Sequence, residues 1–296
     1  MPAHRLAHTI AATQPLAAQV ILRVVPKTGR LHHQSQEEKM NLVRTSRETL
    51  LKPLQAVSGI IERRHTLPIL SNVLLQRTDS RMVFIATDIE IEIAAELGIE
   101  APGENRGVTV GARKLLDILR ALPDAAEVLL TLQDKRLQVK SGKSRFNLQT
   151  LPPEDFPRMA PAESGGVGFK MPQGALKKLL ALVQYAMAQQ DIRYYLNGLL
   201  MVVEAGELKL VATDGHRLAY TSRKLDTAEV GKHEVILPRK TIVELARLLT
   251  DGDEPLDIRL AANQARFTFG DVVLVSKLVD GKFPDYTRVI PQNHPK

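Results

Sequence analysis

Two kinds of hydrophobic pattern alternate along the chain beyond about residue 40. Isoleucines at positions 89, 91 and 93 alternate with glutamates, which is typical of a half-buried antiparallel strand. Between Leu50 and Ile61 the apolar residues recur at helical spacing instead, after a capping-box pattern formed by Thr45 and Glu48. The sequence therefore predicts short strands interspersed with helices.

Four helices follow from the spacing of the apolar residues. In the first, which covers 50–61, Pro53 predicts a kink and Gly59 an early end. The others are expected at 113–122, 174–187 and 239–250.

Apolar runs between these helices predict strands. The expected ranges are 73–77, 82–87, 89–97, 127–132, 136–140 and 145–150, then 199–204, 208–212 and 218–223. Because helix and strands recur within each half of the chain, the expected fold class is α+β with largely antiparallel sheets.

The same features recur at an offset of 126 residues. Phe-Ile-Ala-Thr-Asp at 84–88 matches Leu-Val-Ala-Thr-Asp at 210–214, and the basic pairs at 113–114 and 239–240 share the offset. Several matches in one register over such a length indicate two like domains and not a short-period solenoid.

The repeat divides the chain. Residues 1–39 share nothing with either copy, so we expect a disordered or mis-assigned leader there. Residues 40–164 and 165–291 are the two expected domains, joined by a glycine-containing linker at 161–168, and 292–296 form a tail. A length of 296 residues, 44% of them hydrophobic, suffices for two ordinary cores.

The composition excludes several kinds of chemistry. The absence of cysteine rules out disulfides, thiolate metal sites and a cysteine nucleophile, and it fits a reducing cytosol. No apolar run reaches the roughly 18 residues that span a bilayer. We therefore expect a soluble cytoplasmic protein without a membrane partner.

The formal net charge of +7 does not by itself indicate nucleic-acid binding, because an ordinary mixed surface explains it equally well. The positions of the basic residues along the chain are more informative. Basic residues fall on or at the ends of the predicted helices: Arg47, Lys52, Arg113, Lys114, Lys177, Lys178, Arg239 and Lys240. Each of these residues taken singly is explained as a solvated surface lysine or arginine. As a set on repeated helices, however, they favour a surface that faces a polyanion.

Candidate catalytic groups are incomplete. The glycines at 165–168 lack the flanking strand, helix and Lys-Ser/Thr of a phosphate loop. Asp214 and His216 lie near Arg217, but no nucleophile, second carboxylate or metal-ligand spacing completes a site. We expect no enzyme activity, no cofactor and no metal.

Longer motifs carry a resemblance to a known family. They are Thr-Leu-Pro-Ile-Leu at 66–70, Tyr-Tyr-Leu-Asn-Gly at 194–198, Thr-Asp-Gly-His-Arg-Leu at 213–218 and Lys-Leu-Val-Asp-Gly-Lys-Phe-Pro-Asp-Tyr at 277–286. From about Met40 to Pro291 the chain closely resembles the bacterial DNA polymerase III beta subunits, the replicative sliding clamps.

The resemblance implies a ring of six like domains in which helices line the central hole and antiparallel sheets form the outside. Such a ring tethers the replicative polymerase to duplex DNA without catalysing a reaction. It must attract phosphates without reading bases, because sequence-specific contacts would stop it sliding. The implied partners are duplex DNA, DNA polymerase III, clamp-loader subunits and further clamp subunits.

The family's functional positions map onto three sets of residues. The resemblance implies DNA contacts at Arg64, Gln190, Arg193, Tyr194 and Tyr195. To these we add the basic pair that opens the last predicted helix, Arg239 and Lys240. The two tyrosines could instead be core residues. The pocket for partner peptides maps to Leu196, Thr213, Gly215, His216, Arg217, Leu218, Pro284, Arg288 and Val289. The dimer edge maps to Lys114, Lys143, Arg145, Phe146 and Leu148.

Family members carry a third copy of the domain after the Phe-Pro-Asp-Tyr motif, whereas this sequence continues for ten residues beyond Tyr286. We therefore expect a truncated clamp with a half-built pocket and an unpartnered dimer edge. Two alternatives stay open: three two-domain chains could supply six domains through strand pairing, or the chain could be a DNA-binding or partner-binding module that cannot encircle a duplex.

Overall fold

The computed structural model describes residues 39–62, 67–99, 104–162, 166–226 and 231–291. All of these residues belong to one compact unit, Glu37–Lys296. Most of the expected leader, Arg64, residues 163–165 of the expected linker and the expected tail lie outside the described residues.

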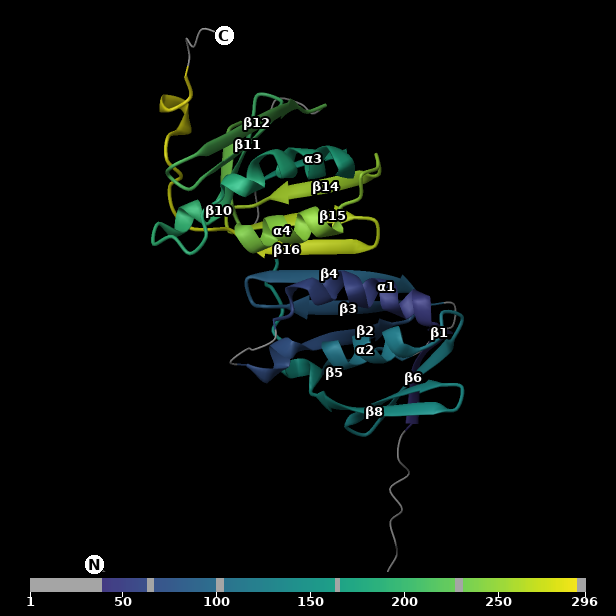
Figure 1. Cartoon of the computed structure of the whole chain (residues 1–296). Helices are drawn as coiled ribbons and strands as arrows, with labels where there is room; N and C mark the ends of the chain where they lie inside the picture. The colour runs from purple at the N-terminus through teal and green to yellow at the C-terminus, as the bar shows by residue number, and fades with distance from the viewer. Residues whose placement is uncertain (1–38, 63–66, 100–103, 163–165, 227–230, 292–296) are drawn as a thin grey trace, which may run out of the picture. The chain divides into compact units, whose positions relative to one another are not determined.

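The first half of this unit repeats the order strand, helix, three strands (Figure 1). The elements are β1 Lys39–Ser46, α1 Arg47–Val57, β2 Asn72–Thr78, β3 Arg81–Thr87 and β4 Ile91–Gly98, then β5 Arg106–Gly111, α2 Ala112–Ala121, β6 Glu127–Gln133, β7 Arg136–Ser141 and β8 Ser144–Leu151.

The second half has the same order. Its elements are β9 Val167–Pro172, α3 Gln173–Val183, β10 Gly198–Glu204, β11 Glu207–Thr213 and β12 Leu218–Lys224, then β13 His233–Pro238, α4 Arg239–Leu248, β14 Pro255–Leu260, β15 Gln264–Phe269 and β16 Val272–Lys277. Short 3-10 turns cover Ser58–Ile60, Pro68–Ser71, Pro153–Asp155, Gln184–Ala186, Tyr194–Leu196 and Tyr286–Arg288.

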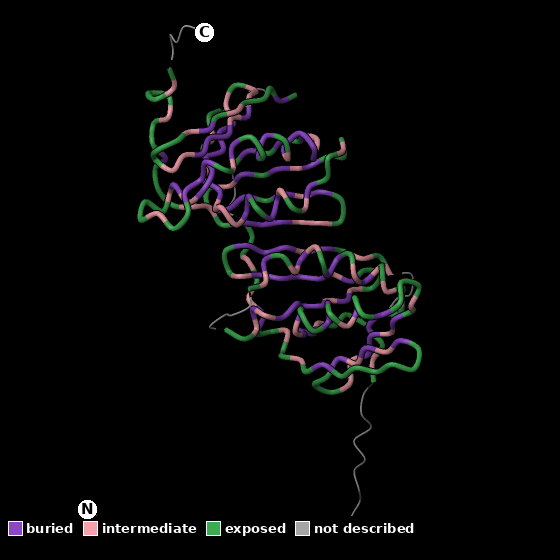
Figure 2. The backbone as a smooth tube through the Cα atoms, viewed as in Figure 1, coloured by how far each residue is buried: buried purple, intermediate pink, exposed green. Residues whose placement is uncertain are grey.

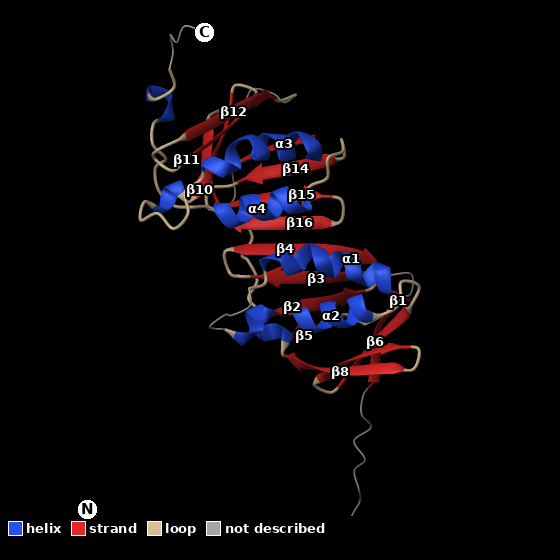
Figure 3. Ribbon diagram, viewed as in Figure 1, coloured by secondary structure: helices blue, strands red, loops and turns tan. Residues whose placement is uncertain are grey.

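The described strands pair antiparallel, which confirms the predicted α+β class (Figure 3). One sheet has the order β1-β6-β7-β8-β5-β2-β3-β4-β16-β15-β14-β9 and the other β12-β11-β10-β13. Each half contains two helices, and the strand before one helix pairs with the first strand after the other helix. In the first half β1 pairs with β6 and β5 with β2. In the second half β9 pairs with β14 and β13 with β10. This exchange ties the two repeats of each half together.

The sequence did not reveal the strands β1, β5, β9 and β13, each of which runs directly into a helix. The predicted capping box is wrong by one residue, because Thr45 lies in β1 and Ser46 is the N-cap. The hydroxyl of Ser46 accepts a hydrogen bond from the Thr49 amide at 3.2 Å. The strand expected at 89–97 begins instead at Ile91.

The helices bury apolar faces against the sheets, and buried positions alternate with exposed ones along them (Figure 2). Leu50, Leu54 and Val57 of α1 are fully buried, as is Leu115 of α2. Repetition is visible in the packing as well: the pairs Leu115/Thr241 and Leu116/Ile242, 126 residues apart, are buried in both halves.

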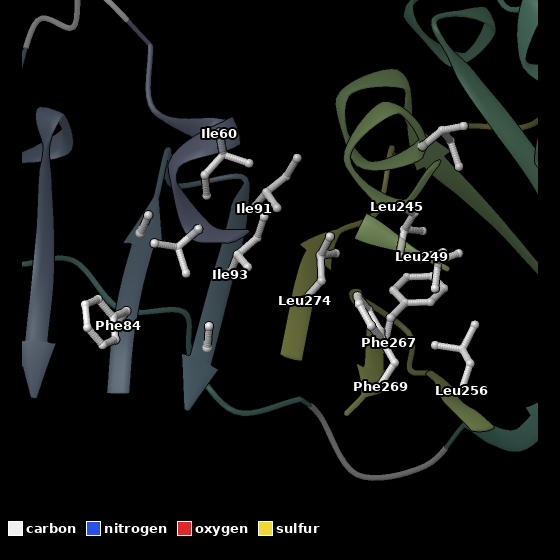
Figure 4. Close-up of a cluster of buried hydrophobic side chains, with 14 of the residues drawn as sticks. Ile60, Phe84, Ile91, Ile93, Leu245, Leu249, Leu256, Phe267, Phe269 and Leu274 are labelled. Atoms are coloured by element: carbon white, nitrogen blue, oxygen red, sulfur yellow. The ribbon is translucent and has the colours of Figure 1, made fainter. Parts of the chain in front are cut away.

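The two halves are joined edge to edge by β4 and β16. Residues 91–95 pair with 272–276, and Ile93 lies opposite Leu274. Both side chains are fully buried, and Figure 4 shows them turned toward the same cluster beneath the helices. Among the described helices, none combines the length and the apolar character needed to cross a bilayer.

Candidate nucleic-acid and partner interfaces

The repeated Thr-Asp motif forms the same turn in both halves. The Thr87 hydroxyl donates to the Ile91 carbonyl at 2.9 Å, and the Asp88 carboxylate accepts from the amides of Glu90 and Ile91. Thr213 donates likewise to Arg217, and Asp214 accepts from the amides of His216 and Arg217. The motif is therefore a structural turn between paired strands, which accounts for its recurrence without invoking catalysis.

The carboxylate of Asp214 is held in its charged form. Backbone hydrogen bonds from Arg217 and His216 lower its pKa, with a smaller contribution from the positive charge of Arg217. The guanidinium of Arg217 lies 3.0 Å from Asp214 and 5.7 Å from the centre of the Tyr185 ring. Tyr185 is exposed, and the sequence motifs gave no sign of its contact with Arg217.

The expected DNA-contact loop is organised around Asp191. Arg193 donates two side-chain hydrogen bonds to this carboxylate, at 3.0 and 2.8 Å, and these hold the pKa of Asp191 at about 2. Arg193 also reaches the Asp214 carbonyl at 3.4 Å, so the loop lies beside the second Thr-Asp turn. Gln190 bends the loop with a positive φ of 56°.

The two adjacent tyrosines are in different environments. Tyr194 is 56% exposed, whereas Tyr195 packs against the apolar cluster that contains Leu196 and Phe283. Their rings meet edge to face with centroids 5.9 Å apart. Tyr195 is therefore the tyrosine that fits the alternative of a core residue, and Tyr194 is the one available to an external partner.

Arg239 and Lys240, the pair that opens α4, are both engaged within the protein. Arg239 donates to the Met187 carbonyl at 3.3 Å, beyond the end of α3. Lys240 lies 2.5 Å from Asp88 and 2.8 Å from Glu62, which both belong to the other half of the chain. Burial lowers the pKa of Lys240, but the hydrogen bonds to the two carboxylates outweigh it, so the pKa is raised.

Arg47 is similarly occupied. Its guanidinium donates to the Leu119 carbonyl at 2.7 Å and pairs with Asp124, and its side chain is 15% exposed. Arg47 therefore binds the C-terminal end of α2, where carbonyls lack helical partners. Of the other helical cations, Lys177 pairs with Asp251 at 3.2 Å. Lys52, Arg113, Lys114 and Lys178, which the sequence also placed on the helices, are exposed.

The expected peptide-pocket residues lie on and beside the sheet β10–β13. Leu196 is buried and packs in one cluster with Leu218. Tyr286 of the last 3-10 turn stacks on Tyr220 of β12 with ring centroids 5.9 Å apart. This stacking brings the segment with Pro284, Arg288 and Val289 to the same sheet as Leu218.

The rim of this region is open to solvent. His216 and Arg217 are exposed, and so are Pro284, Arg288 and Val289, the last by 65%. Gly215 has a φ of 88°, and a side chain there would meet the Arg193 guanidinium at 3.0 Å. The described residues thus supply an apolar floor with a polar rim on one side.

Four of the expected dimer-edge residues lie on β8 or in the turn before it, and Lys114 lies in α2. Strand β8 pairs along its length with β7, but with β5 only through Thr150 and Leu151. The other edge of β8 has no strand partner over 144–149 among the described residues. Phe146 is 37% exposed there, Leu148 is buried, and Lys114 is exposed at the start of α2.

Two family models match the chain. The model of the DNA polymerase III beta subunit N-terminal domain matches residues 40–160, and the model of the central domain matches residues 170–285. The two matches follow each other in the order of the two structural halves.

Whole proteins give the same result. The beta sliding clamp of Salmonella typhimurium is 49% identical over 250 residues, which are 84% of this chain and 68% of that protein. The beta sliding clamp of Pseudomonas aeruginosa is 47% identical over the same shares. The crystal structure of the Pseudomonas aeruginosa DNA polymerase III subunit beta superposes with a TM-score of 0.82 at 46% identity, covering 86% of this chain and 69% of that one.

Proposed function

Because the chain belongs to the DNA polymerase III beta subunit family, the sliding clamps, we propose that it encircles duplex DNA and tethers a replicative polymerase there by topology. The single observation that carries this proposal is the family match in both halves, at 49% identity to a sliding clamp. The proposed domains are residues 40–164 and 165–291.

The proposed DNA surface is the exposed side of the helices. Lys52, Arg113, Lys114 and Lys178 are exposed on α1, α2 and α3, and long side chains there reach phosphates without reading base edges. Arg64, Gln190, Arg193 and Tyr194 are proposed to add contacts, with Tyr194 stacking or hydrogen-bonding to a strand. Tyr195, Arg239 and Lys240 act in this proposal by holding the surrounding structure.

The proposed partner site is the region around Leu196 and Leu218. A short peptide from DNA polymerase III or a clamp loader would place an aliphatic or aromatic anchor on the apolar floor and hydrogen-bond to the rim. Asp214 supports the rim by fixing the turn that carries His216 and Arg217.

We propose that the protein performs no chemical step and needs no cofactor. The paired Thr-Asp turns use their carboxylates for backbone hydrogen bonds, which leaves them a structural task. We propose the cytoplasm as the site of action, because bacterial chromosomal DNA, the proposed ligand, lies there.

Retention on closed and cut DNA tests the proposal. The chain would be assembled on a nicked circular duplex with a clamp loader of the same family, and retention at moderate salt compared before and after linearisation. A topological clamp stays on the circle and runs off the linear form, whereas an open DNA-binding module dissociates equally from both as salt rises. Equal retention on the two templates contradicts encirclement.

Charge variants locate the DNA surface. Reversing Lys52 and Lys178 to Glu together is expected to weaken salt-sensitive DNA binding and flatten its salt dependence by about two phosphate contacts. Lys135→Glu, an exposed residue in the turn between β6 and β7, is the matched control and should have little effect.

A further inference from the structure

A small cavity lies at the joint between the two halves, outside the proposed DNA surface and the proposed partner site. Its volume is about 240 Å³. The first half contributes Thr87 and Ile89, and the second half contributes Asn263, Gln264 and Lys277. Residues 157–160, which belong to the segment between the halves, form the remaining wall. The cavity therefore depends on the joint being formed.

The connecting segment is fastened on both sides of the joint. Arg158 donates two hydrogen bonds to the Glu92 carboxylate, at 3.0 and 3.1 Å, and the Met159 amide donates a third at 3.0 Å. The Glu92 side chain is only 8% exposed, so these charge-assisted bonds are shielded from water. On the other side, the Ala160 carbonyl accepts from Gln264 at 3.4 Å. The cavity is thus formed in advance, as ligand sites usually are.

Part of the lining is apolar. Ile89, Pro157 and Met159 supply this part. Ile89 has a φ of 81°, which strains a β-branched residue, and it is 40% exposed. Packing against the described residues leaves its side chain partly open, and a ligand in the cavity would cover it.

The charged part of the lining is basic. Arg158 and Lys277 line the cavity with side chains that are each 46% exposed. Their carboxylate partners, Glu92 and Glu90, are not part of the lining, and none of the described residues that form the lining is acidic. A group that enters the cavity therefore meets two cations, which favours an anion.

Gln264 adds unused hydrogen-bonding capacity. It is 7% exposed, and its side chain makes one hydrogen bond among the described residues, the long one to the Ala160 carbonyl. A carboxamide can donate two hydrogen bonds and accept two, and buried polar groups are normally satisfied. A polar ligand in the cavity would supply the partners that the described residues do not.

We propose that this cavity binds an aliphatic carboxylate, with the hydrocarbon against Ile89 and Met159 and the carboxylate held by Lys277 and Arg158. Its volume lies below the roughly 300 Å³ of small ligand pockets, so it takes one side chain and its carboxylate and not a folded segment. A free short-chain acid and the C-terminal residue of a peptide share this chemistry. The inference goes beyond the proposed function and does not rest on it.

The repeat explains why this cavity and the proposed partner site select different ligands. Thr87 pairs with Glu92 in the first half as Thr213 pairs with Leu218 in the second. A buried carboxylate with its own arginine therefore stands where the proposed partner site has an apolar floor residue. Ligands of the one site are not expected to occupy the other.

NMR titration of the isotope-labelled 296-residue chain tests the proposal. The probe is N-acetylleucine, and N-acetylleucinamide is the uncharged probe of the same shape. The acid is expected to bind with a Kd of about 1 mM, as suits a ligand of about a dozen heavy atoms, and to shift the amide signals of 158–160 and 263–264. The amide should bind at least about fivefold more weakly. No shift up to about 10 mM acid, or equal binding of the two probes, overturns the proposal.

Charge variants at exposed positions identify the residues that hold the carboxylate. Lys277→Gln should weaken binding of the acid about fivefold or more, and Asn263→Asp should weaken it by adding a negative charge. Lys232→Gln is the matched control, because it breaks an exposed ion pair with Glu234 outside the cavity and should leave the Kd unchanged. Equal effects of Lys277→Gln and Lys232→Gln contradict the site.

A tetrapeptide that ends in leucine separates the two sources of the carboxylate. Tighter binding of this peptide than of N-acetylleucine supports the site with a chain terminus as its ligand, and weaker binding supports it with a free acid. If the same peptide with an amidated C-terminus binds as tightly as the free peptide, the proposal is wrong. The titrations use no DNA, so their failure is distinguishable from a failure of the proposed encirclement.

Discussion

Ile89 and Gly215 occupy the same position in the two Thr-Asp turns, and both have left-handed backbone, with φ of 81° and 88°. Glycine adopts this region freely, whereas a β-branched residue is strained there. The turn geometry is therefore set by the strand pairing and the Thr and Asp hydrogen bonds, strongly enough to impose it on an isoleucine.

Glycine should be the better small residue at position 89. Ile89→Gly is expected to be more stable than Ile89→Ala by about 1 kcal/mol, because both remove the side chain but only glycine relieves the backbone. Denaturant unfolding of the two variants measures the difference.

The control is Ile61, whose φ is −76°. There the order should reverse, with Ile61→Gly less stable than Ile61→Ala. Equal stability of Ile89→Gly and Ile89→Ala would mean that the positive φ carries no strain.

Arg47 should contribute to the stability of the fold and not to the charged surface of the helices. Arg47→Ala removes the donor to the Leu119 carbonyl and is expected to lower the free energy of unfolding by about 2 kcal/mol. Lys52→Ala, on the exposed side of the same helix, should change it by less than about 0.5 kcal/mol. Similar effects of the two substitutions would contradict the role assigned to Arg47.

Most of the fold was predictable because the signal is local. Alternating apolar residues gave the strands within each half, and the offset of 126 residues gave the repeat. The strands before the helices were missed because they run into the helices without a turn, as at Ser46–Arg47 and Pro238–Arg239. Period alone does not mark a change from strand to helix inside one continuous segment.

The basic residues on the helices show what local patterns omit. Lys240 and Lys178 both lie on predicted helices, but only the first has acidic partners in the other half of the chain. Asp88 is separated from Lys240 by 152 residues, and no periodicity in the sequence connects them. Tertiary contact therefore separates cations that hold the structure together from cations exposed to a ligand.

The Lys240–Asp88 pair should stabilise the joint between the halves. Lys240→Met is expected to cost about 2 kcal/mol, because it leaves the Asp88 side chain, which is only 7% exposed, without its ion-pair partner. Lys177→Met, at the more exposed pair with Asp251, is the control and should cost less than about 1 kcal/mol. Chemical denaturation of both variants makes the comparison.

The same pair gives a pH dependence. Since the pKa of Lys240 is raised above 10.5 in the folded protein, its contribution is fully present below that value and is lost as the pH rises through the folded pKa. The stability difference between the parent protein and Lys240→Met should therefore shrink above about pH 10.5. A difference that stays constant to about pH 11.5 would mean that the ammonium charge does not contribute.

Substitutions of the two adjacent tyrosines should affect different properties, DNA binding for Tyr194 and stability of the fold for Tyr195. Tyr194→Ala is expected to weaken DNA binding by about five- to tenfold with little change in unfolding, because its ring is exposed and available for stacking. Tyr195→Ala removes a ring packed against the Leu196 cluster and should lower the free energy of unfolding by about 2–3 kcal/mol. Fluorescence anisotropy with a primed DNA duplex and thermal unfolding of both variants give the two readouts. If Tyr194→Ala destabilises the fold as much as Tyr195→Ala, the assignment of Tyr194 to the ligand side is wrong.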